Sequence, residues 1–214
     1  MDKTQLLNEL KEEVGKCRRC PLYKTRTKVV FGTGLASAKL MMVSEAPGYW
    51  EDQKGEPFVG AAGKVLNELL DSVGIKREEV YIANLLKCRP PENRDPEEEE
   101  IKACTPYLER QIEIIKPEII CPLGRYSMKF LMKRFGLEDR IEGISKIHGR
   151  LFKVHPVKSL QSKVFAEDEQ FNRVKNLSQN ITVIPFYHPA VATYNPNMKK
   201  VLEEDFKILK TIIK

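Results

Sequence analysis

Five cysteines are the residues whose types and spacing point most directly to chemistry. Two residues separate Cys17 from Cys20, a spacing that lets both thiolates bind one metal centre. Cys88 and Cys104 can supply two further ligands, and four thiolates suit either zinc or an iron–sulfur cluster. A thioredoxin-type redox pair is less favoured, because the intervening arginines follow a charged helical pattern. Cys121 lies in an apolar run and is interpreted as a core thiol.

Three segments rich in polar and turn-forming residues each follow an apolar, strand-like run. They are residues 44–52 (SEAPGYWED), 84–93 (NLLKCRPPEN) and 187–190 (YHPA). Ligands of open α/β sheets bind at the carboxyl ends of the strands. We therefore expect the three segments to meet at one crevice.

The elements that must position these segments alternate between strands and helices. Strands are predicted at 39–43, 80–85, 118–123, 151–155 and 181–186. Helices are predicted near the N-terminus and at 61–73, 96–116, 124–135 and 199–213, with Asp95 expected to cap the helix at 96–116. This order predicts an α/β three-layer sandwich, in which helices flank a mostly parallel sheet of four or slightly more strands. Residues 156–180 are predicted to be an irregular polar insertion.

The composition fits one globular domain spanning residues 1–214. Hydrophobic residues make up 42% and charged residues 31%, which excludes a disordered chain, a collagen-like repeat and a disulfide-dense miniprotein. No uncharged apolar run is long enough to cross a bilayer. The charged N-terminal segment does not resemble a secretory signal. A cytoplasmic location is therefore expected.

The net charge of +6 is a modest excess of basic residues. Basic residues gather without acids in 16–28 and in a second stretch, 146–163, which includes Lys158 and Lys163. Such a distribution is compatible with a polyanionic partner. It is equally compatible with the solvated lysines of a heat-stable protein.

Beyond these patterns, the sequence resembles the uracil-DNA glycosylase superfamily, and within it the thermostable family 4 enzymes that carry a [4Fe–4S] cluster. The resemblance rests on residues 44–52, 55–63 (GEPFVGAAG), 84–93 and 188–190, together with the four cysteines Cys17, Cys20, Cys88 and Cys104. It runs from about Cys17 to Asn195. The first motif of the family usually begins with glycine, whereas this chain has Ser44, and the insertion at 156–180 is longer than expected for the family.

The resemblance implies a monomeric base-excision-repair enzyme that flips uracil out of single- or double-stranded DNA. It would hydrolyse the N-glycosidic bond without nicking the strand. It also implies a structural [4Fe–4S] cluster held by Cys17, Cys20, Cys88 and Cys104, and no nucleotide cofactor. The residues do not identify a sliding clamp or another protein partner. The alternative function is a metal-stapled nucleic-acid-binding module that senses bases without cleaving them; an electron-transfer protein would leave the polar segments unexplained.

Three side chains are predicted to hold the flipped base. Phe58 would stack on it, an interaction worth about 1–3 kcal/mol. The amide of Asn84 offers the donor and the acceptor that match uracil O4 and N3–H. By the resemblance, Glu51 would fill the space of a C5 methyl group and disfavour thymine, a task that Tyr49 or Trp50 could share.

The resemblance also assigns roles in bond cleavage. His188 would donate a hydrogen bond to uracil O2 as negative charge develops on the leaving base. Since Ala46 stands where a well-known related family has a water-activating aspartate, Glu45 and Asn93 are the candidates to stabilise the sugar cation or to position water. The backbone amides of Ala46 and Gly48 would contact uracil O2.

Contacts with the rest of the DNA are expected from two segments. Val191 or Tyr194 would fill the gap left by the flipped base, and Lys199 and Lys200 would hold phosphates. The small residues 60–63 allow either close phosphate approach or tight packing. His148 and His155 lack the sequence context of His188 and are not expected to act in catalysis.

Overall fold

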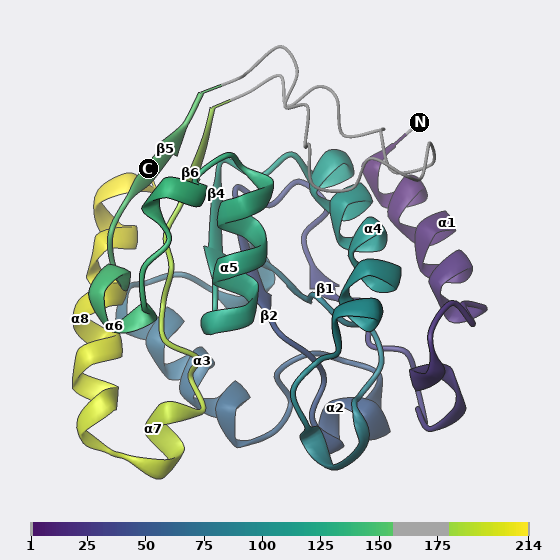
Figure 1. The fold of residues 1–214 in the computed structure, drawn as a ribbon. Helices are drawn as coiled ribbons and strands as arrows, with labels where there is room; N and C mark the ends of the chain where they lie inside the picture. Colours follow the sequence, from purple (N-terminus) through teal and green to yellow (C-terminus); the bar gives the residue numbers. More distant parts are fainter. Residues whose placement is uncertain (1, 156–179, 214) are drawn as a thin grey trace.

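The computed structural model describes residues 2–155 and 180–213 (Figure 1). Most of the predicted insertion, with Lys158 and Lys163, lies outside these residues. Six strands form one sheet in the order β1-β3-β2-β4-β6-β5. They are β1 (Thr33–Gly34), β2 (Leu40–Ser44), β3 (Tyr81–Asn84), β4 (Ile119–Pro122), β5 (Phe152–Val154) and β6 (Ile181–Val183). The four inner strands are parallel and the two edge strands antiparallel, which confirms the predicted mostly parallel sheet.

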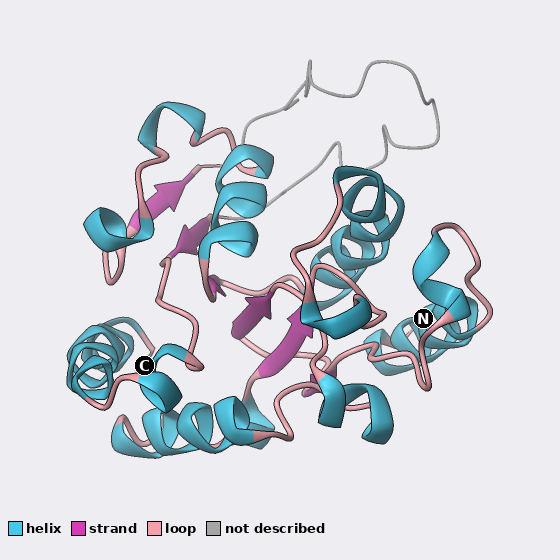
Figure 2. Cartoon of the chain, turned by 60° about the horizontal axis from the view of Figure 1, so that its bottom comes forward, coloured by secondary structure: helices cyan, strands magenta, loops and turns pink. Residues whose placement is uncertain are grey.

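Helices cover both sides of the strands (Figure 2). The helices are α1 (Lys3–Gly15), α2 (Tyr49–Lys54), α3 (Ala61–Ser72), α4 (Glu98–Ile115), α5 (Arg125–Arg134), α6 (Ile144–Ile147), α7 (Val191–Tyr194) and α8 (Asn197–Ile212). Helices α1, α4 and α5 pack on one face of the sheet, and α3 and α8 pack on the other. The layers are those of the predicted three-layer α/β sandwich. Among the described residues, no helix is both long and apolar enough to cross a membrane.

Each face of the sheet has its own hydrophobic core because strand side chains alternate between the faces. In β2, Met41 and Val43 join the core beneath α1, α4 and α5, whereas Leu40 and Met42 join the core beneath α3 and α8. Both faces of β2 are therefore buried, as is usual for a strand inside a parallel sheet. Burial on both faces explains why this strand reads as a continuous apolar run in the sequence.

Two local predictions were wrong. Residues 49–54 were expected to be part of a loop but form α2, which ends at Gly55 in the left-handed region (φ 80°). The buried carboxylate of Asp52 in α2 accepts two hydrogen bonds from the backbone N–H of Thr27, at 3.0 and 3.1 Å. The second error concerns α4, whose cap is Glu97 and not Asp95: the Glu100 side chain reaches back to the Glu97 N–H in a capping box.

The register of the parallel strands places the predicted site segments together. Ser44, the last residue of β2, pairs with Asn84, the last residue of β3. Leu123, which follows β4, forms an isolated bridge with Phe186, two residues before His188. The carboxyl ends of the central strands therefore deliver all three polar segments to one edge of the sheet.

Candidate active site and cysteine cavity

A cavity of about 320 Å³ lies at this edge of the sheet. Its volume is within the range typical of small-molecule sites. Eight residues predicted for base binding or catalysis line it, namely Glu45, Ala46, Gly48, Glu51, Phe58, Asn84, Asn93 and His188, whereas Tyr49 and Trp50 do not. Ser44, Pro47, Ala62, Pro90, Arg94 and Ala190 complete the lining. The structure thus brings the predicted residues together, while their individual roles stay predictions.

The segment that carries Phe58 is held in an uncommon conformation. Phe58 has φ 54°, in the left-handed region that few non-glycine residues adopt. Glu51 secures the segment, because its Oε1 accepts hydrogen bonds from the N–H groups of Val59 and Gly60 at 2.9 and 3.0 Å. Gly63 packs so closely that a Cβ there would lie 1.9 Å from the Phe58 carbonyl oxygen. At Gly63 the lack of a side chain therefore allows tight packing, which is one of the two alternatives for residues 60–63.

The imidazole of His188 is held at both nitrogens. The Ala190 N–H donates to Nδ1 at 3.1 Å, so Nδ1 carries no proton. Nε2 must then carry it, and it lies 2.9 Å from the Ser44 Oγ. Burial lowers the pKa of His188 to about 4, although the charge of Glu51 opposes the shift. The ring is therefore neutral at neutral pH and donates its one hydrogen bond to Ser44.

The environment of His188 also explains its orientation. Gly124, at φ 92°, would bring a Cβ within 3.3 Å of the His188 Cβ. The Gly124 N–H donates to the Phe186 carbonyl at 2.9 Å, which fixes the segment leading to the histidine. The Phe58 ring lies 5.6 Å away from the imidazole, centroid to centroid, at an interplanar angle of 22°. The two rings therefore face the same cavity in nearly parallel planes.

Asn84 is supported by a buried polar network that sequence reasoning missed. The Lys87 Nζ donates to the Asn84 carbonyl at 2.9 Å and to the Gln111 Oε1 at 2.6 Å. The Gln111 Nε2 in turn donates to the Phe31 carbonyl and to the Tyr81 hydroxyl, at 2.9 and 3.0 Å. Burial lowers the pKa of Lys87 to about 8. A glutamine on the apolar face of α4 was the available sequence signal for this network.

Glu45 and Asn93 also line the cavity. Burial raises the pKa of Glu45, the charge of Asp95 adds to the rise and that of Arg125 opposes it. Asn93 is in the left-handed region (φ 56°), and its Oδ1 accepts a hydrogen bond from the Arg89 Nε at 2.8 Å. This bond orients the amide of Asn93 within the lining.

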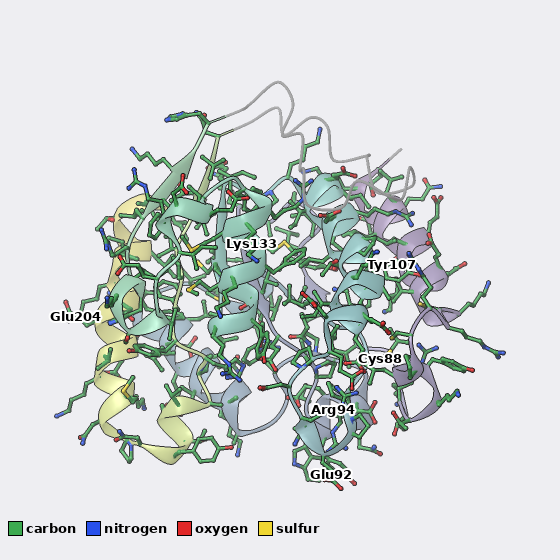
Figure 3. All side chains as sticks on the ribbon, in the orientation of Figure 1. Cys88, Glu92, Arg94, Tyr107, Lys133 and Glu204 are labelled. Atoms are coloured by element: carbon green, nitrogen blue, oxygen red, sulfur yellow. The ribbon has the colours of Figure 1, made fainter. Side chains whose placement is uncertain are left out.

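Arg94 is a cavity residue that the sequence did not reveal. Its two terminal nitrogens donate to both carboxylate oxygens of the buried Glu100, at 2.9 and 2.6 Å. Figure 3 shows Arg94 near the beginning of α4, the helix that carries Glu100. The loop between β3 and α4 is thereby fixed to the start of that helix.

The other aromatic and histidine candidates lie outside the cavity lining. Tyr49 and Trp50 are 49% and 57% exposed, and Tyr194 on α7 is 87% exposed, whereas Val191 is half-buried. His148 is paired with Asp205 at 2.8 Å. These positions leave Tyr194 as the more accessible of the two residues predicted to fill the DNA gap.

Cys17, Cys20, Cys88 and Cys104 line a second, smaller cavity between the segment after α1, the β3–α4 loop and α4. Two N–H groups donate to these sulfurs: one from Arg26 to the Cys88 Sγ at 3.3 Å, and the Lys87 backbone N–H to the Cys104 Sγ at 3.2 Å. Cys121 is buried in the other core, as predicted for a packed thiol.

The arrangement of the four sulfurs can be compared with that of a metal site. Within the described ranges, no three or more His, Cys, Asp or Glu side chains form a group suited to hold a single ion. The four thiols instead surround a common space, together with Arg26, Tyr107 and Tyr23. Four thiols around one space are a donor set for either zinc or an iron–sulfur cluster.

Comparison with known proteins gives one family and several close relatives. A sequence model described as the uracil DNA glycosylase superfamily matches residues 31–210. The chain is 45% identical over 207 residues to a type-4 uracil-DNA glycosylase of Sulfurisphaera tokodaii, covering 96% of this chain and 84% of that protein. It is 37% identical over 212 residues to a type-4 uracil-DNA glycosylase of Thermotoga maritima, covering 98% of this chain and 96% of that protein. The similarity therefore extends over nearly the whole chain.

Proposed function

The chain belongs to the uracil DNA glycosylase superfamily, and from this premise we propose its reaction and the residues that perform it. The protein is a hydrolase of N-glycosyl bonds that removes uracil from DNA in DNA repair. Water adds to C1′ while the base leaves with the bonding electron pair, so the products are free uracil and an abasic site. The proposed reaction uses water and no lysine nucleophile, so we expect a glycosylase without strand-nicking activity.

The observation that carries the proposal is the shared cavity of Asn84, Phe58 and His188. A flipped uracil lies against the Phe58 ring, and the stacking energy of about 1–3 kcal/mol offsets much of the cost of flipping. The Asn84 amide reads O4 and N3–H, whereas cytosine presents the opposite pattern of donors and acceptors. Glu51 holds the Phe58 segment through Val59 and Gly60 and, in the same position, restricts the space for a C5 methyl group.

Bond cleavage depends more on stabilising the departing uracil anion than on a side chain that takes a proton from the attacking water. Ala46 cannot take a proton, so the negative charge on uracil O2 must be met by hydrogen-bond donors. The neutral imidazole of His188 contributes through its one N–H, and the backbone N–H groups of Ala46 and Gly48 supply further donors. Glu45 and Asn93 line the same cavity, and their proposed roles are to stabilise the cationic sugar and to position the attacking water.

A [4Fe–4S] cluster is the cofactor that fits the four cysteines. Cys17, Cys20, Cys88 and Cys104 would hold it, because all four line one space, and the resemblance to the family 4 enzymes favours a cluster over zinc. When bound, a cluster with four protein ligands has no open position for chemistry, so its contribution is structural. It would join the basic segment after α1 to the β3–α4 loop that carries Asn93 and Arg94.

A uracil-containing oligonucleotide tests the function. We expect the purified protein to leave an alkali-labile site at uracil in single- and double-stranded DNA, with no break before alkali treatment. Chromatography of the reaction mixture should recover free uracil in equal amount. Tight binding without any abasic product would instead favour the nucleic-acid-binding alternative. The monomeric state, the cytoplasmic location, the single domain and the heat stability stay predictions.

The pH dependence of the reaction tests Glu45. Because the pKa of Glu45 is raised, its carboxylate becomes protonated at a higher pH than that of an exposed glutamate. The rate therefore falls as the pH decreases through that pKa. His188 adds no limb in this range, since its pKa is lowered to about 4. We expect Glu45→Gln to be slower at neutral pH and to lose the acid limb in single-turnover rates measured from about pH 5 to 8. Parallel profiles of the two proteins would assign that limb to another group.

A further inference from the structure

We propose that Ser44 is a further catalytic residue, whose hydroxyl passes the hydrogen bond of His188 on to uracil O2. This inference rests on the proposed function. Ser44 stands where the resemblance leads one to expect glycine, which has no side chain to take this part. It ends β2 beside Asn84, lines the cavity, and is 1% exposed.

The hydrogen bonds of His188 leave no other route for its proton to reach the base without rearrangement. Nδ1 accepts from the Ala190 N–H at 3.1 Å, and Nε2 lies 2.9 Å from the Ser44 Oγ. The single N–H of the neutral ring is therefore given to Ser44. A base that enters the cavity meets a histidine whose donor is already engaged by this hydroxyl.

A hydroxyl that accepts a hydrogen bond still has its own proton to donate, and accepting makes it a stronger donor. The backbone carbonyl of Ser44 accepts from the Leu85 N–H at 2.9 Å, and Ser44 is among the residues that line the cavity. The Ser44 O–H can then donate to uracil O2 as the C1′–N1 bond breaks and its electron pair moves onto the base. No proton needs to leave His188 in this step.

Rigidity makes the relay suited to catalysis. Ser44 is fixed by the parallel ladder of β2 with β3, and His188 is fixed by the Ala190 N–H and the close approach of Gly124. Donors that are already aimed at the developing charge cost no reorganisation when the bond breaks. A relay between two such anchors therefore stabilises the leaving base more than the ground state.

Single-turnover rates of Ser44→Ala and Ser44→Gly test this relay. We expect each to slow uracil release by about tenfold or more, while the affinity for uracil-containing DNA changes less than about twofold. In a His188→Ala background, Ser44→Ala should cause a smaller loss than in the wild type, because the hydroxyl that it removes is no longer strengthened by the imidazole. Thermal melts of every variant show that the comparison is between folded proteins.

Ser127→Ala is the matched control. Ser127 is also fully buried, but its Oγ donates to the Leu123 carbonyl at 2.9 Å and it is not among the described lining residues. We expect it to keep the wild-type rate. Ser44 variants as fast as the wild type or faster, or losses that multiply with that of His188→Ala, would overturn the relay. Failure of the wild-type protein to release uracil would overturn the proposed function instead, so the two failures are distinguishable.

Discussion

His188→Ala is expected to slow the release of uracil from DNA by about 10²–10³-fold, the usual effect of removing one preorganised donor from a developing anion. The substitution removes the neutral imidazole from the cavity and with it the bond to the Ser44 Oγ. DNA affinity should change little, because the imidazole acts on charge that exists only as the bond breaks. Single-turnover rates and binding to uracil-containing DNA, measured on the same preparations, separate the two effects.

His155→Ala is the control for this substitution. His155 is exposed, and its Nδ1 lies near Asn180, away from the cavity lining. We expect it to keep the wild-type rate. If His188→Ala lost DNA affinity and rate in equal proportion, the histidine would be a binding residue, and the base-sensing alternative would gain support.

Cys104→Ser is expected to cause the second large effect, a loss of bound iron and sulfide with a fall of more than about 4 kcal/mol in the free energy of unfolding. The buried Cys104 lies on α4 and faces the same space as Cys17, Cys20 and Cys88. Without the fourth ligand, the segments after α1 and β3 lose the group that joins them to α4. Metal and sulfide analysis, together with a denaturant melt, measures both parts of the prediction.

Cys121→Ala serves as the matched cysteine variant. Cys121 is buried in the core beneath α3 and α8, away from the cysteine cavity. It should keep full iron content and lose only the stability expected for a small cavity. Wild-type protein that binds zinc in place of iron and sulfide, or equal metal loss in both variants, would contradict the assigned cluster.

The layers of the fold could be predicted from the sequence because the inner strands are continuous apolar runs between amphipathic helices. The short elements could not be predicted in this way. Six-residue α2 has no room for a helical repeat, and it is held by a contact between Asp52 and Thr27 that depends on tertiary structure. The cap of α4 was misplaced because several acids precede the helix, and only the structure shows Glu100 reaching back to Glu97.

The residues that line the site could also be predicted from the sequence, since parallel strands bring their carboxyl ends to one edge of the sheet. The hydrogen bonds that orient the side chains of the site could not be predicted. Lys87 and Gln111 meet across the core, and Ser44 meets His188 from a different strand end. Such pairings depend on packing between distant segments, so the residue types alone could not identify the partners.

Base discrimination by Asn84 is the most direct measurement of the proposed site. Single-turnover base release should be compared for otherwise identical oligonucleotides that carry uracil, thymine or cytosine. We expect the wild-type protein to release uracil alone, and Asn84→Asp to lose about 10- to 100-fold in that rate, because a carboxylate repels O4 where the amide donated. Equal rates for wild type and Asn84→Asp on uracil, or release of thymine or cytosine by the wild type, would contradict a cavity that reads the edge of uracil through Asn84.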